Sequence, residues 1–325
     1  MPDRYNKAIV IGDACVDVHL KMANLLDDTK AVPYRMVLGG TSASCAGTLA
    51  RLGIDTSFLG TVGKDFGGRF IINELKTLRI DTEMTIVKEE LNTVNVLAFI
   101  DDQGERHLWG FPRVEQAYPD LDLKRVDLYK IKTASWLHSS GMTALVKGSM
   151  QDNLPELYKI AYEAGVPTSF DLNTRVSDLS LLDPKGVEAI KKILPYVRFL
   201  FGSIKDEFYS FRPCEDPMDS ARFFTGKDKT VIARMGKDGF VIMKDGEERK
   251  YATYEVEAVN TTGAGDSFNA GFIAAMLRGE DVYEAAEFAN AVAAYKISRE
   301  EQDTCISYEM IVDFMKDHHL RNRED

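Results

Sequence analysis

The sequence lacks three features that would each point to a different class of protein: paired cysteines, a long apolar run and an excess of basic residues. Its four cysteines, Cys15, Cys45, Cys214 and Cys305, form no C-x-x-C pair and no zinc-ligand spacing. Scattered thiols of this kind are typical of a reducing compartment. No apolar run approaches the length needed to cross a bilayer, and the first one, Ala8–Ile11, is too short for the core of a signal peptide. We therefore expect a cytoplasmic protein.

The charge balance argues against two classes of partner. The chain carries 51 acidic and 40 basic residues, which gives a net charge of −11 at pH 7. An acidic surface repels nucleic acids and anionic membranes, so neither is expected as a partner. The 325 residues, 45% of them hydrophobic, suffice for a large core in one domain or two. The sequence contains no internal repeat and no low-complexity linker.

The segments that are present alternate between two kinds of pattern. Several β-rich runs end in Gly, Asp, Asn or Ser, and helical patterns such as Leu154–Ala164 and Val187–Leu194 lie between most of them. This alternation predicts a mostly parallel sheet covered by helices on both faces, with ligands bound beyond the carboxyl ends of the strands. The runs are Ala8–Asp13, Ser57–Gly63, Ser135–Gly141, Pro167–Asn173, Phe199–Ser203 and Thr230–Gly236.

Two segments break the alternation because neither has a helix of its own. Residues 15–38 contain short alternating stretches, and residues 93–113 include a predicted hairpin with its turn at 101–104. We expect these two segments to form a small β-sheet lid over one end of the main sheet. A lid that closes over a bound ligand can exclude water from reacting groups.

The most informative stretch is Thr261–Asp266, in which small residues are followed by a carboxylate and then by a predicted amphipathic helix that ends at Gly279. Small residues at a helix entrance leave the first backbone N–H groups open to an anion, and the helix dipole favours negative charge there. A carboxylate beside such a pocket can deprotonate an attacking hydroxyl. The arrangement is typical of a kinase.

These residues resemble a signature of the ribokinase-like (PfkB) carbohydrate kinases, T-x-G-A-G-D, which Thr261–Asp266 matches. A second signature of that family begins with a Gly-Gly pair, here Gly39 and Gly40, and runs to a G-x-D-x-x-G segment, here within residues 60–67. The resemblance spans nearly the whole chain. It implies one kinase domain over residues 1–325, a three-layer α/β/α fold with a mostly parallel sheet, and a β-sheet lid that often mediates homodimers.

The resemblance assigns the chemistry to the first signature. It implies that Asp266 is the general base that takes the proton from the sugar hydroxyl, and the helix dipole favours the ionised form that a base needs. The alternative for Asp266 is an ordinary helix N-cap. Gly263, Ala264 and Gly265 would hold the transferring phosphoryl group with their N–H groups. The same glycines would also suit a tight strand-to-helix turn.

The resemblance also implies a set of sugar-binding residues. Asp17 would accept hydrogen bonds from sugar hydroxyls, and the alternative for it is a solvated turn acid. Gly39 and Gly40 would let the backbone approach the sugar. Thr41 and Ser44 depart from the usual pattern, since many relatives have asparagine at the position of Ser44. That departure concerns the substrate more than the reaction.

Two arginines are candidates for binding an acidic sugar, because arginine binds carboxylates bidentately. Arg113 follows the predicted hairpin. Arg175 closes Asp171–Arg175, which resembles the D-x-N-x-R element of fructokinase-like and 2-keto-3-deoxygluconate kinase-like members. The alternative is a solvent-exposed pair, with Arg175 bridging to a nearby acid.

The cofactors implied are ATP and Mg²⁺, with a monovalent cation such as K⁺ as a further possibility. The family's N-x-x-E element, which helps to organise Mg²⁺ through water, corresponds to Ser203 and Asp206, or to Glu207 if the register slips by one residue. The alternative is an ordinary helix start capped by Ser203. The usual loop near the adenine is replaced here by residues 299–304. The other residues expected on the ATP side are Arg234, Gly236, Gly239, Thr261 and Asn290.

Three functions remain open from the sequence. The first is a kinase that uses ATP and Mg²⁺ to phosphorylate a small sugar or sugar acid, working as a homodimer through the β-lid. The second is a nucleoside kinase of the same fold, in which Trp109 and Phe111 of the lid stack on the base. The third is a sugar- or nucleotide-binding regulator without catalysis.

Overall fold

The computed structural model describes residues 5–21, 34–100, 106–299 and 306–321. Within these residues the largest element is an eight-stranded sheet, parallel except for its antiparallel edge at β13 and β14. The strand order is β14 (Glu247–Tyr251), β13 (Phe240–Lys244), β12 (Thr230–Arg234), β11 (Phe199–Ser203), β10 (Thr168–Asp171), β9 (Trp136–Ser140), β1 (Ala8–Ile11) and β4 (Thr56–Leu59).

The sequence of β1 explains why the sheet is buried on both faces. Side chains of a strand alternate between its faces. Ala8 and Val10 accordingly belong to one hydrophobic cluster, and Ile9 and Ile11 belong to another on the opposite face. An uninterrupted apolar run is typical of a central parallel strand. The edge strand β14 is instead made of charged and exposed residues, which disfavour pairing with another sheet.

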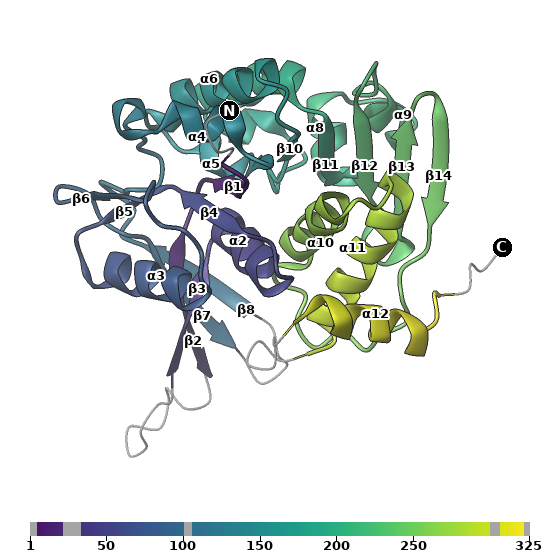
Figure 1. The fold of residues 1–325 in the computed structure, drawn as a ribbon, viewed down its shortest axis with the longest axis horizontal. Coiled ribbons are helices and arrows are strands. Elements are labelled where there is room, and N and C mark those ends of the chain that lie inside the picture. Colours follow the sequence, from purple (N-terminus) through teal and green to yellow (C-terminus); the bar gives the residue numbers. More distant parts are fainter. Residues whose placement is uncertain (1–4, 22–33, 101–105, 300–305, 322–325) are drawn as a thin grey trace.

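Helices cover both faces of the sheet, so the predicted three-layer architecture is confirmed (Figure 1). One layer contains α2 (Thr41–Arg51), α3 (Phe66–Thr77), α10 (Ala264–Arg278), α11 (Val282–Ile297) and α12 (Tyr308–Asp317). The other contains α4 (Leu128–Thr133), α5 (Met142–Leu145), α6 (Met150–Glu163), α7 (Pro184–Ile193), α8 (Tyr209–Phe211) and α9 (Pro217–Arg222). Single turns of 3₁₀-helix lie at Leu123–Arg125, Leu179–Leu181, Leu194–Tyr196 and Gly236–Asp238, and a π-helical turn, η4, lies at Ile204–Phe208.

The helix that follows the Thr261–Asp266 turn is the central one of its layer. α10 packs against α11 and α2, and every residue from Asp266 to Ala275 is buried. The helix begins after Gly263, which is left-handed at φ 74°, and ends at Gly279, which is left-handed at φ 98°. The sequence predicts an amphipathic helix here, but α10 is buried nearly all round because it has helical neighbours as well as the sheet. Its position holds the first turn rigidly.

The two segments without helices form a separate four-stranded sheet, which confirms that part of the expectation. Its order is β3 (Tyr34–Gly39), β2 (Cys15–Lys21), β7 (Asn95–Ile100) and β8 (Arg106–Phe111). Figure 1 shows this sheet, here called the lid, beside α2 and α3 at one end of the molecule. The predicted hairpin turn at 101–104, residues 22–33 of the first lid segment and residues 300–304 of the adenine loop lie outside the described residues.

A further pair of short parallel strands, β5 (Thr61–Gly63) and β6 (Ile86–Lys88), lies next to the lid segments in the sequence. Asp65 caps α3 and also accepts a hydrogen bond from the N–H of Thr93, at 2.7 Å, which ties this region to the start of β7. In the part of the chain that the structure describes, the helices are too short or too polar to cross a membrane.

Candidate active site

The Thr261–Asp266 turn exposes backbone donors at the start of α10. The Asn260 side chain accepts a hydrogen bond from the N–H of Thr262 at 3.0 Å, and the N–H of Ala264 donates to the Thr261 carbonyl at 3.3 Å. Within the described ranges, the N–H groups of Gly263 and Gly265 have no hydrogen-bond partner. Two open donors at the positive end of a helix form an anion-binding site.

The same turn separates two cavities. Thr261, Ala264 and Gly265 line one of them, which we call the nucleotide cavity, and its volume is about 480 Å³. Gly263 and Asp266 line the other, called the acceptor cleft, and its volume is about 220 Å³. An anion at the open N–H groups would therefore lie between two compartments, which is the geometry that transfer of a group between two ligands requires.

The nucleotide cavity is largely apolar and contains all the residues predicted on the ATP side. Gly239 (φ 96°) takes a conformation that L-residues rarely adopt, and a Cβ there would lie 1.9 Å from the carbonyl oxygen of Tyr251. The amide of Asn290 donates to the Ala252 carbonyl at 2.9 Å, which orients it at the cavity wall. The predicted residues that line the cavity are Ser203, Arg234, Gly236, Gly239, Thr261 and Asn290. The apolar walls include Phe240, Val256, Phe268, Ala293 and Ile297.

The acceptor cleft is lined by acids, by one arginine and by lid residues. Of the predicted sugar-binding residues, the structure places Asp17, Gly40, Thr41, Ser44 and Arg175 in its wall. Gly39 does not line the cleft but lies next to Asp17, where a Cβ would be 2.4 Å from the Asp17 carboxylate. The glycine therefore leaves the space that the Asp17 side chain occupies.

Asp13 is a cleft residue that the sequence reasoning did not select. It ends the first β-run, and its carboxylate accepts hydrogen bonds from the Thr41 N–H at 2.8 Å, the Thr41 hydroxyl at 2.7 Å and the Ser42 N–H at 3.1 Å. It thus fixes the start of α2 against the end of β1 and lines the acceptor cleft. Its position at the carboxyl end of a strand was a usable signal. Tyr118, another cleft residue, follows no motif, and no local pattern marks it.

Asp266 lies at the cleft wall with its carboxylate unbonded to any other residue that the structure describes. Burial raises the pKa of Asp266 to about 8, and the negative charges of Asp171 and Asp13 add to the effect. The sequence predicts that the helix dipole favours the ionised form. Burial and the two neighbouring acids oppose this effect of the dipole and favour the neutral form. A carboxyl group whose pKa is close to neutral is well matched to proton transfer.

A buried cluster of polar and charged side chains packs against the Thr261–Asp266 turn. The Arg234 guanidinium donates to both oxygens of Asp171 at 2.7 and 2.9 Å, and the Asn269 amide donates to Asp171 at 2.6 Å. Arg234 also lies 2.8 Å from the position that a Cβ on Gly265 would occupy. Arg234, which the sequence predicts on the ATP side, is therefore paired with Asp171 and packs against the backbone of the turn at Gly265.

Asp206 and Glu207 lie on one π-helical turn but differ in burial and in their position relative to the nucleotide cavity. In η4 (Ile204–Phe208) the backbone hydrogen bonds span five residues, one more than in an α-helix. Glu207 is buried and lines the cavity, whereas Asp206 is exposed and accepts a hydrogen bond from the Ser203 hydroxyl. The Glu207 carboxylate accepts the Ser203 N–H at 2.7 Å and lies 3.9 Å from Arg234. Burial, together with the charge of Asp171, raises the pKa of Glu207 to about 7.

The described residues contain no group of three or more His, Cys, Asp or Glu side chains that could hold a metal ion. Glu207 by itself fits only an indirect contact to Mg²⁺, in which water or phosphate oxygens supply the other ligands.

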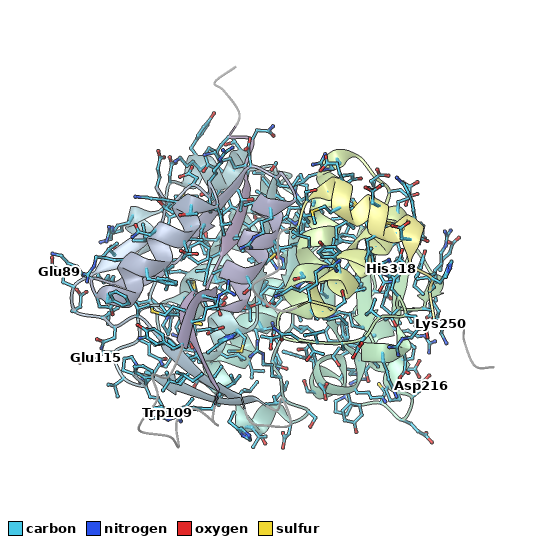
Figure 2. The ribbon with its side chains drawn as sticks, turned by 90° about the horizontal axis from the view of Figure 1, so that it is seen from below. Glu89, Trp109, Glu115, Asp216, Lys250 and His318 are labelled. Atoms are coloured by element: carbon cyan, nitrogen blue, oxygen red, sulfur yellow. The ribbon has the colours of Figure 1, made fainter. Side chains whose placement is uncertain are left out.

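Three predicted side chains do not reach the acceptor cleft. Arg113 is exposed, and its Nε donates to the Gly110 carbonyl, so the side chain folds back on the end of β8. It lines a separate groove with Glu115 and Lys147. Trp109 stacks on Phe111, with ring centroids 5.7 Å apart, and is 53% exposed. Figure 2 shows Trp109 on the outside of the molecule at the lid, whereas the adjacent Leu108 lines the cleft from the other face of β8.

Curated relatives act on different sugars. Over 262 residues the chain is 29% identical to an ATP-dependent ribose-1-phosphate kinase from Halopiger xanaduensis, covering 81% of each chain. Over 299 residues it is 29% identical to a 5-dehydro-2-deoxygluconokinase from Geobacillus thermodenitrificans, covering 89% of this chain and 87% of the relative.

A solved structure shares the fold. It is a candidate ribokinase II from E. coli in complex with ATP and Mg²⁺, with a TM-score of 0.83 and 23% identity, over 96% of this chain and 100% of that chain.

The family comparison covers nearly the whole molecule. The model of the pfkB family carbohydrate kinases matches residues 6–308. This range includes the Thr261–Asp266 turn, all the residues that line the acceptor cleft, and all those that line the nucleotide cavity except Arg321. The matched range therefore contains the strands and helices that build the site. The chain belongs to the pfkB family of carbohydrate kinases and is a phosphotransferase that acts on a sugar hydroxyl.

Proposed function

We propose that the protein transfers the γ-phosphate of Mg²⁺-ATP to a hydroxyl of a small sugar or sugar derivative, with Asp266 as the general base. The observation that carries the proposal is the division of the turn between the two cavities: Ala264 and Gly265 line the nucleotide cavity, and Gly263 and Asp266 line the acceptor cleft. A terminal phosphate that enters from the first and a hydroxyl that enters from the second would meet at the turn.

The chemistry needs few groups from the protein. The bond between the γ-phosphorus and the β,γ-bridging oxygen breaks, a bond from the acceptor oxygen to the γ-phosphorus forms, and the hydroxyl proton passes to Asp266. The N–H groups of Gly263 and Gly265 stabilise negative charge on the moving phosphoryl group. Mg²⁺, when bound with the nucleotide, neutralises phosphate charge, and Glu207 contributes an oxygen on the nucleotide side. Asp17, Asp13 and Arg175 orient the acceptor.

A sugar is favoured over a nucleoside as the acceptor. Most apolar residues of the acceptor cleft are small or aliphatic, such as Val96, Ala98 and Leu108. Tyr118 contributes an aromatic ring to the wall, but the aromatic pair Trp109 and Phe111 lies elsewhere. A cleft of about 220 Å³ lined by acids suits a compact polyol.

The proposal extends to the assembly and the cell compartment. The exposed apolar residues of the lid, among them Tyr34 and Trp109, support a homodimer that forms through the lid. The use of ATP supports a cytoplasmic location.

ADP formation with Mg²⁺-ATP and a panel of sugars tests the proposal. The panel contains ribose, fructose, 2-keto-3-deoxygluconate, their phosphorylated derivatives, adenosine and pseudouridine. We expect sugar-stimulated ADP formation that disappears with EDTA. ADP formation that no sugar stimulates would contradict the proposal, and stimulation by a nucleoside alone would replace the acceptor class.

A further inference from the structure

A third cavity, of about 380 Å³, adjoins the acceptor cleft, and the phosphoryl transfer proposed above does not involve it. The two share Asp17, Ser44, Thr262 and Gly263 as lining residues. The rest of its wall comes from the lid strand β3, from α2 and α3, from the start of α10 and from the end of α11. We call this space the adjoining cavity. It lies on the acceptor side of the turn, since Ala264 and Gly265 line only the nucleotide cavity.

The adjoining cavity collects positive charge in an acidic protein. Arg35, Arg51 and Lys296 line it, against the two carboxylates of Asp17 and Glu74. The balance in the acceptor cleft is the reverse, with three aspartates and one arginine, Arg175. A ligand that spans both spaces would therefore place hydroxyl groups among the aspartates and a negative group among the three cations.

The geometry of α2 directs one of these cations into the cavity. Ala43, Ser44, Gly47, Thr48 and Arg51 line the cavity and lie on one face of the helix. The Arg51 guanidinium folds back along this face, so that its Nη1 lies 3.2 Å from where a Cβ on Gly47 would be. The absence of a side chain at Gly47 leaves the guanidinium room.

Arg35 and Lys296 approach from other elements. Arg35 comes from the lid strand and Lys296 from the last turn of α11, so cations from three separate elements converge on one cavity. Each of the three already interacts with another group of the protein, so an incoming anion would join or replace existing contacts.

We propose that the adjoining cavity is an anion subsite of the acceptor and that it holds a phosphate group, so that the acceptor is a phosphorylated sugar. This inference rests on the proposed kinase function. A phosphate monoester carries close to two negative charges at neutral pH and offers three strong acceptor oxygens. Two arginines and one lysine match it better than they match the single charge of a sugar carboxylate. The transferred phosphate is attached at the opposite end, at the hydroxyl near Asp266.

The test compares matched acceptors at saturating Mg²⁺-ATP. The pairs are ribose with ribose 1-phosphate and with ribose 5-phosphate, and fructose with fructose 1-phosphate and with fructose 6-phosphate; 2-keto-3-deoxygluconate represents a sugar carboxylate. We expect kcat/KM for one phosphorylated sugar to exceed that of its parent sugar by about 100-fold, the effect of charge-assisted contacts to the phosphate.

Variants separate the subsite from general damage. Arg51→Met and Lys296→Met should each raise KM for the phosphorylated sugar by about 10- to 100-fold, with a much smaller change in KM for ATP. Arg69→Met is the matched control, because Arg69 is exposed on α3 and lines neither cavity. If Arg51→Met fails to fold, Lys296→Met carries the test.

The outcomes distinguish the inference from the proposed function. Equal or better turnover of the parent sugars, or a preference for the sugar carboxylate, overturns the phosphate subsite while the kinase proposal stands. KM values in Arg51→Met and Lys296→Met that match those in Arg69→Met also overturn it. ADP formation that no acceptor stimulates would instead sink the kinase proposal itself.

Discussion

The cavities on the two sides of the Thr261–Asp266 turn are lined by different kinds of residue. The nucleotide cavity combines apolar side chains such as Phe240, Val256 and Phe268 with the backbone of glycines and with a few polar side chains such as Asn290. The acceptor side is built from charged side chains, with acids in the cleft and cations in the adjoining cavity. Apolar walls and backbone N–H groups suit a ligand that every member of a kinase family shares. Charged side chains suit a ligand whose identity must be distinguished, so specificity is expected on the acceptor side.

The largest effect is expected where the two sides meet. Asp266→Asn removes the base but retains the size of the side chain, so kcat should fall by about 10²- to 10⁴-fold while KM for ATP changes little. Steady-state ADP formation by the purified variant measures this, with circular dichroism as the check on folding. Turnover within a factor of a few of the parent enzyme would remove Asp266 from the mechanism.

The next largest effect is expected for Arg234, which packs against the turn that the two cavities share. Arg234→Met leaves Asp171 and Glu207 buried without their cation, which should lower the free energy of unfolding by about 3–5 kcal/mol. Urea denaturation measures the change. Arg222→Met provides a contrast, because Arg222 pairs with Asp219 and Glu248 at an exposed site, where the loss should be below about 1 kcal/mol. Similar losses in the two variants would contradict the structural role given to Arg234.

A change on the acceptor side should leave the nucleotide side unaffected. Asp17→Asn replaces a charged hydrogen-bond acceptor, so kcat/KM for the sugar should fall by about 10- to 100-fold with KM for ATP nearly constant. Varying each substrate in turn at a fixed concentration of the other measures both constants. A parallel rise in both KM values would show that Asp17 acts on the fold rather than on the acceptor.

The converse change fills the nucleotide cavity. Ala293 lines its wall on α11, and Ala293→Phe should raise KM for ATP by about 10-fold through crowding, with little change in KM for the sugar. The same two titrations provide the readout. An increase confined to the sugar KM would reverse the assignment of the two cavities.

The pH dependence follows from the raised pKa of Asp266. The base must be ionised, so kcat/KM should rise about tenfold per pH unit below about 8 and level off above it. The folded-state pKa lies above the ordinary value of 3.8, so the protonated form stabilises the fold at low pH, and this stability is lost as pH rises from about 4 to about 8.

Asp266→Asn cannot ionise and should therefore gain stability relative to the parent protein at pH 9 more than at pH 6. The exposed Asp206→Asn variant is the control and should show no such pH-dependent gain. A pH profile that is flat between 6 and 9, or equal stability differences at the two pH values, would contradict the raised pKa.

The sequence was sufficient for features that depend on local pattern. Ala8–Ile11 and the other β-rich runs form strands of the main sheet, except that the run Ser57–Gly63 divides between β4 of that sheet and β5 of a separate pair. The small residues of Thr261–Gly265 form the turn at a helix start. Both follow from short-range rules for side-chain alternation and helix entrances.

The sequence was insufficient where distant segments meet. The raised pKa of Asp266 depends on Asp171 and Asp13, from two other strand ends, and no local pattern reports their proximity. The burial of Glu207 and the exposure of Asp206 occur on a π-helical turn that the residue spacing does not predict. The adjoining cavity is lined by residues from six elements, β2, β3, α2, α3, α10 and α11, so its net charge could not be predicted before the fold was known.

The central claim is that the turn brings a terminal phosphate and an acceptor hydroxyl together from opposite sides. A crystal structure of Asp266→Asn with a non-hydrolysable ATP analogue and the preferred sugar tests it most directly. We expect the γ-phosphate within hydrogen-bond distance of the Gly263 and Gly265 N–H groups and the acceptor hydroxyl beside residue 266. A γ-phosphate away from the turn, or a sugar outside the cleft lined by Asp13 and Asp17, would contradict it.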